Sequence, residues 1–69
     1  MSLYGNVRAA CIKNGISVMA LEDRLGFPRS SICKWDAHTP SVIKVGLVAD
    51  FLNVPIDELL KGEEVEPVE

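Results

Sequence analysis

The chain has 69 residues, of which 48% are hydrophobic and 25% charged, and its formal net charge is −3. This length allows one small domain with a small core, and the apolar content excludes a disordered chain. No apolar run approaches the roughly 18 residues of a membrane span, and the N-terminus lacks the basic and apolar regions of a signal peptide. We therefore expect a cytoplasmic protein that does not associate with a membrane.

Helical periodicity and turn residues divide the chain into five predicted helices. An apolar stripe at three-and-four spacing indicates a first helix over residues 3–14, with Gly15 as its left-handed cap. Ser17 is a suitable N-cap for the second helix, and Gly26 ends that helix.

The remaining predicted helices begin at proline or serine. Pro28 suits the first turn of a third helix that ends near Asp36. Ser41 caps a fourth helix, in which Gly46 indicates close packing against another helix. A short fifth helix follows over residues 56–60.

The predicted organisation is a single all-α domain over residues 1–62, followed by an acidic C-terminal tail over residues 63–69. No segment alternates with the period of a strand. The tail holds four glutamates and no base, so the domain holds seven bases and six acids. We expect the tail to be frayed. Because the overall field gives no attraction, binding of nucleic acid requires a local basic face.

Cysteine and histidine are scarce. Cys11 and Cys33 are too few for a disulfide scaffold, and with the single His38 they do not supply four zinc ligands at finger spacing. No catalytic motif is present, and so small a helical chain offers no deep cleft. We expect a protein that is not an enzyme and that has no metal, cofactor or small-molecule ligand.

The third predicted helix separates apolar from basic side chains. At about 100° per residue, Ile32 and Trp35 fall on one side, and Arg29, Ser30 and Lys34 on the other. Because charged side chains are rarely buried unpaired, the basic side is expected to face solvent. Two helices joined by a short turn containing Gly form a helix-turn-helix, whose second helix enters the major groove of DNA.

Two segments carry a resemblance to a known family. LGFPRSSICKWD (residues 25–36) and VADFLNVPIDELL (residues 48–60) resemble two blocks of the lambda-repressor-like (Cro/CI-type, XRE) helix-turn-helix family, in the right order and spacing. With the first helix, the resemblance covers roughly residues 3–62. It implies a five-helix domain that binds double-stranded DNA, typically a phage or prophage transcriptional repressor.

The resemblance also implies the site residues. Arg29, Ser30 and Lys34 match the base-reading positions of the recognition helix, with Ser31 beside them in the motif. Ser17 matches the start of the second helix, which contacts phosphate in relatives.

The chain departs from the family's pattern at several positions. Val18 stands where Gln is often found and has no side-chain donor for a phosphate. Glu22 stands where a small Ala is common, and we expect its carboxylate at the edge of the domain. Pro28 and Pro55 stand where a capping Ser is common, so those caps must be made differently.

Two further residues are candidates for contacts to the DNA backbone. Lys44 lies in the first turn of the fourth predicted helix, and His38 lies in the loop before it. The alternative for both is an ordinary solvated side chain.

Two classes of function follow. The first is a sequence-specific DNA-binding regulator. It is expected to act as a homodimer on a pseudo-palindrome, because one module makes too few contacts for tight binding. The dimer is expected to use apolar residues left over on the last two helices, such as Phe51 and Leu60. The alternative is a protein-interaction module, of antitoxin or antirepressor type, that binds another regulator.

Overall fold

The computed structural model describes residues 2–61, and every regular element within them is helical. This confirms the predicted all-α class. The elements are α1 (Leu3–Lys13), α2 (Val18–Leu25), the 3-10 helix η1 (Ile32–Lys34), α3 (Val42–Leu52) and α4 (Ile56–Leu60). The predicted tail over residues 63–69 lies outside the described residues. None of the helices described is long and apolar enough to cross a membrane.

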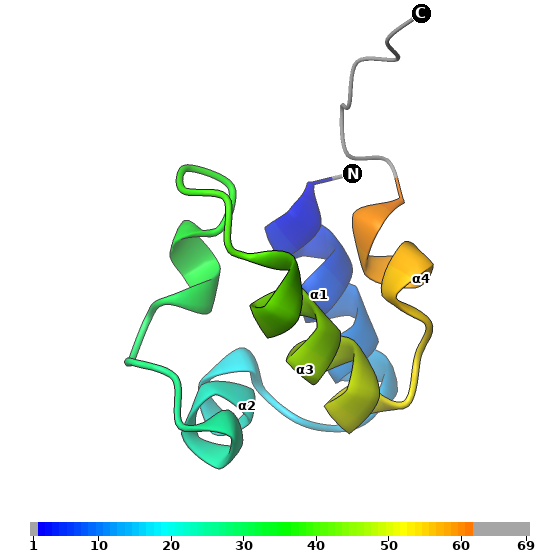
Figure 1. Ribbon diagram of the computed structural model, residues 1–69. Coiled ribbons are helices and arrows are strands. Elements are labelled where there is room, and N and C mark those ends of the chain that lie inside the picture. The colour runs from blue at the N-terminus through cyan, green and yellow to red at the C-terminus, as the bar shows by residue number, and fades with distance from the viewer. Residues whose placement is uncertain (1, 62–69) are drawn as a thin grey trace, which may run out of the picture.

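Helix α1 is the central element of the bundle, and α2, η1, α3 and α4 all pack against it. In Figure 1, α3 crosses in front of α1, α4 lies on the right and α2 at the lower left. Residues 27–40 form the left edge of the molecule in this view. The elements share one core of apolar side chains, which consists of Leu3, Val7, Ala10, Cys11, Leu21, Ile32, Trp35, Val45, Val48, Ala49, Leu52 and Leu59.

Most predicted helix ends are confirmed by their caps. The Ser17 Oγ accepts a hydrogen bond from the Ala20 N–H at 3.0 Å, and the Ser41 Oγ accepts one from the Lys44 N–H at 3.3 Å. Gly26 ends α2 with a φ of +73°, a left-handed conformation that glycine adopts without steric strain.

The predicted third α-helix over residues 28–36 is wrong in both type and extent. Ser30 has a φ of +67°, which interrupts a right-handed helix, and only Ile32–Lys34 is helical, as a 3-10 turn. The Trp35 N–H donates to the Ile32 carbonyl across three residues, at 3.0 Å. A 3-10 helix has three residues per turn, so Ile32 and Trp35 lie one above the other and both reach the core.

The close packing predicted at Gly46 is absent among residues 2–61, which the structure describes. A Cβ built at this position meets no atom within 4 Å. Helix α3 buries the face that carries Val45, Val48, Ala49 and Leu52, and Gly46 is half-buried at the edge of this face.

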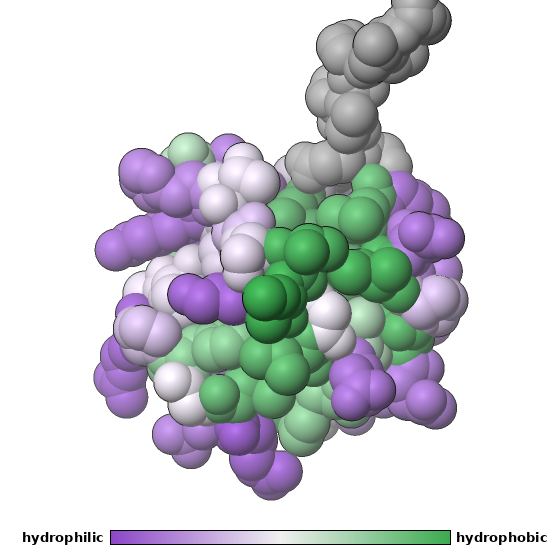
Figure 2. Space-filling view, viewed as in Figure 1, coloured by the Kyte–Doolittle hydropathy of each residue, from purple (hydrophilic) through white to green (hydrophobic). Residues whose placement is uncertain are grey.

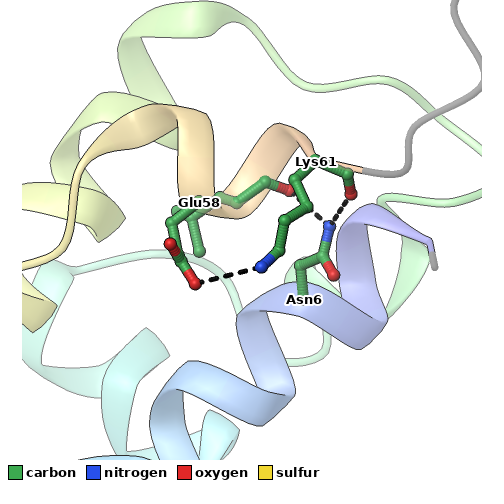
Figure 3. A network of polar contacts seen from close by, with 4 residues as sticks. Asn6, Glu58 and Lys61 are labelled. Carbon is green, nitrogen blue, oxygen red and sulfur yellow. Dashed lines mark hydrogen bonds and ion pairs between the residues drawn. The ribbon is translucent and has the colours of Figure 1, made fainter.

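A buried amide ties α1 to the end of α4 (Figure 3). The Asn6 Nδ2 donates to the Leu59 carbonyl at 2.8 Å and to the Lys61 carbonyl at 2.6 Å. The last carbonyls of a helix have no partner within it, so Asn6 supplies the donors that α4 lacks at its C-terminus. The neighbouring Lys61–Glu58 ion pair, at 3.3 Å, is exposed and contributes little.

Candidate nucleic-acid interface

The Glu22 side chain of α2 binds the backbone of the segment over residues 28–38, which lies between α2 and α3. This side chain is only 3% exposed. Its Oε1 accepts from the Ser30 N–H at 2.9 Å, and its Oε2 accepts from the Ile32 N–H at 3.0 Å. The expectation of a carboxylate at the edge of the domain is therefore wrong. Backbone donors at the start of η1 bind both oxygens, and these bonds make the burial of a charge tolerable.

Sequence reasoning missed this role of Glu22, although the signal was present. Two departures from the family's pattern occur together: an acid at position 22, and Pro28 where a capping Ser is common. Glu22, on the neighbouring helix α2, accepts from the amide of Ser30, which precedes η1, and from the amide of Ile32, which begins η1.

The inward side of the segment is apolar, as predicted. Ile32 and Trp35 are buried in the core. The ring of Phe27 packs against Trp35 with centroids 6.2 Å apart and a tilt of 50°. The Lys44 Nζ lies 5.9 Å from the centre of the Phe27 ring, within the range of a cation–π contact. This contact joins the start of α3 to the residue that precedes the segment, and at an exposed lysine it contributes only about 0.5–1 kcal/mol.

The outward side of the segment is basic. An open hollow of about 330 Å³ is bordered by the segment and by the first turn of α3. It brings together five of the seven predicted DNA-binding residues, and we call these five the basic pocket: Arg29, Ser31, Lys34, His38 and Lys44. Arg29, Lys34, His38 and Lys44 are exposed, so their polar heads are accessible to a ligand.

The cations of the basic pocket are not neutralised by the described part of the chain. Within residues 2–61 the one ion pair joins Lys61 to Glu58 on α4. Asp36, next to the pocket in sequence, accepts instead from the Tyr4 N–H at 3.0 Å. The Ser31 Oγ is shielded from solvent and has no hydrogen-bond partner among residues 2–61. The pocket therefore offers positive charge to an anion, while the shielded Ser31 hydroxyl is not accessible to it.

Ser17 and Ser30, also predicted to bind DNA, do not line the basic pocket. The Ser17 Oγ is engaged as an acceptor at the N-terminus of α2, which leaves its hydroxyl hydrogen free for a phosphate. Ser30 is exposed, and its N–H is bound to Glu22. A second hollow, of about 430 Å³, is bordered by Arg29 but also by Glu22 and Asp23, so it is less suited to an anion.

The two cysteines occupy different environments. Cys11 lies in the core, as predicted, and burial raises the pKa of its thiol above the ordinary value of 9.0. Cys33 is exposed at η1, and its Sγ–H donates to the Ser30 carbonyl at 3.1 Å.

At pH 8 we expect iodoacetamide to alkylate Cys33 in the folded protein and to leave Cys11 unmodified. The thiolate is the reactive species, and burial keeps Cys11 protonated and covered. The raised pKa of Cys11 also makes the free energy of unfolding fall as the pH rises above 9.0, because the thiol ionises in the unfolded chain and stays protonated in the folded one. Peptide mass spectrometry, with and without denaturant, measures the labelling. Equal labelling of both cysteines in the folded state would contradict this assignment.

No family model matches the chain, and neither does any curated protein or solved structure. Its function must therefore be inferred from its own residues.

Proposed function

We propose that the chain is a sequence-specific DNA-binding transcriptional regulator, of the phage or prophage repressor type, that acts as a dimer on a pseudo-palindromic operator. The basic pocket carries this proposal. The cationic side chains of Arg29, Lys34 and Lys44 gather with His38 on one side of a short segment whose other side is fixed in the core. This concentration of charge occurs in a chain of net charge −3, so it provides the local basic face that binding of phosphate requires.

The proposed binding mode gives each part of the segment a role. The 28–38 segment enters the major groove, which admits an element as wide as an α-helix, while α2 crosses the DNA backbone. Arg29 and Lys34 engage acceptors on the base edges, where guanine presents two. His38 and Lys44 contact phosphates at the mouth of the basic pocket, and Ser17 does so from the start of α2, whereas the Ser31 hydroxyl is shielded and makes no such contact.

The alternative is a module that binds another regulator, and the exposed apolar residues of α3 favour it. Salt dependence distinguishes the two. Contacts to phosphate release counterions, so DNA affinity falls steeply with salt, whereas an apolar protein contact does not.

Selection from a random pool of duplex DNA tests the proposal directly. We expect enrichment of a pseudo-palindromic sequence, and we expect its affinity for the protein to fall steeply between low and physiological salt. A pool that shows no enrichment at low salt would exclude sequence-specific binding.

Replacing Arg29 by Ala should weaken binding to the selected sequence by about 1–3 kcal/mol and relax the preference at one base pair. The matched control is Arg8→Ala, which removes an exposed guanidinium from α1, outside the basic pocket. Fluorescence anisotropy titrations on selected and random duplexes measure both effects. Equal losses on the two duplexes would show that Arg29 contacts the backbone and does not read a base.

A further inference from the structure

Three large apolar side chains form a stripe along the exposed side of α3. Ile43, Leu47 and Phe51 are 72%, 46% and 42% exposed. Their spacing of four residues places each about 40° from the next on one face of the helix. Figure 2 shows apolar residues gathered over α3 at the centre of the view; this apolar surface continues toward α4 on the right, and hydrophilic residues lie at the left, lower and right margins. We call Ile43, Leu47 and Phe51 the α3 stripe.

We infer that the α3 stripe is the contact surface for a second copy of the chain, with the two α3 helices antiparallel about a two-fold axis at Leu47. The stripe is symmetric about that residue, since Ile43 and Phe51 lie four positions to either side. The two-fold axis places Leu47 against its own counterpart and Ile43 against Phe51 of the second copy. The stripe is therefore complementary to itself, as an isologous interface must be.

Other occupants fit the stripe less well. Ile43, Leu47 and Phe51 carry no charge or donor for DNA. The eight residues that follow Lys61 include four glutamates and only two valines, too few apolar side chains to cover the stripe.

Lys44, beside Ile43, lines the basic pocket. A two-fold axis at Leu47 thus leaves one basic pocket on each side, and this link to operator binding rests on the proposed function.

The size of the stripe sets the strength of the contact. A standard interface buries about 800 Å² per partner, and a stripe on one 11-residue helix supplies less. We expect a weak dimer with a dissociation constant in the micromolar range. A duplex with two half-sites would strengthen it by holding both copies together.

Sedimentation equilibrium of the full chain without DNA tests the inference. Leu47→Glu and Leu47→Lys should each weaken self-association by about 100-fold or more, because like charges then meet at the axis. An equimolar mixture of the two variants should associate again as a heterodimer, because the charges are then opposite. The matched control is Ile12→Glu, at a residue 65% exposed on α1, and it should leave self-association unchanged.

A wild-type chain that stays monomeric at millimolar concentration overturns the inference, as does a mixture of the Leu47 variants that fails to associate. If the chain stays monomeric and still selects a DNA sequence, the α3 contact is wrong and the proposed DNA binding stands. If the chain forms the dimer but selects no DNA sequence, the α3 contact stands and the proposed DNA binding is wrong.

Discussion

Replacing Glu22 by Ala should lower the free energy of unfolding by about 3 kcal/mol and abolish the proposed sequence-specific binding of DNA. The substitution leaves the N–H groups of Ser30 and Ile32 without acceptors, and an unpaired buried donor costs about 1–3 kcal/mol. Because the Ile32 side chain is fully buried in the core, a shift of its backbone also disturbs the packing of Trp35. Stability and binding should therefore fall together, although Glu22 is buried and contacts no DNA in the proposed mode.

Urea denaturation and hydrogen exchange measure this effect. The Ile32 amide should exchange faster in Glu22→Ala, and Glu22→Gln should be intermediate because its amide oxygen still accepts one of the two bonds. Asp23→Ala is the matched control, since it removes an exposed carboxylate from the next position of α2. If Asp23→Ala and Glu22→Ala destabilise equally, net charge is responsible and the two hydrogen bonds are not.

The ends of the α-helices could be predicted because each depends on a few adjacent residues. Ser17, Gly26 and Ser41 act within one turn of their own positions, by a hydroxyl acceptor or a left-handed backbone. The form of the 28–38 segment could not be predicted, because a side chain eight to ten residues away binds its backbone. Local propensity favours an α-helix there, and the distant acceptor favours a turn.

The candidate site was predicted in part for a related reason. The outward orientation of Arg29 and Lys34 does not depend on the helix type, because Ile32 and Trp35 share a face at a period of 3.0 or 3.6. His38 and Lys44 line the same pocket as Arg29 and Lys34 only because of the path that the chain takes between η1 and α3. The sequence pattern does not specify that path. It therefore predicted the individual residues but not that they line one pocket.

The contact of Asn6 with the end of α4 could not be predicted from the sequence either, because the partners of Asn6 lie 53 and 55 residues away.

Replacing Asn6 by Ala should lower the free energy of unfolding by about 3 kcal/mol, since the carbonyls of Leu59 and Lys61 lose their donor. Asn6→Asp should be more destabilising at neutral pH, because a carboxylate then faces two carbonyl oxygens. Protonation restores one donor, so this variant should regain stability relative to Asn6→Ala as the pH falls.

Urea denaturation of both variants across a range of pH measures these differences. Asn14→Ala is the matched control: its Nδ2 donates to the Ala10 carbonyl of the same helix at 2.9 Å, and its side chain is exposed. Water can replace that bond, so we expect a loss below about 1 kcal/mol. Equal losses in Asn6→Ala and Asn14→Ala would mean that α4 is held by Leu59 packing alone. A flat pH response of Asn6→Asp would mean that its side chain has turned away from the two carbonyls.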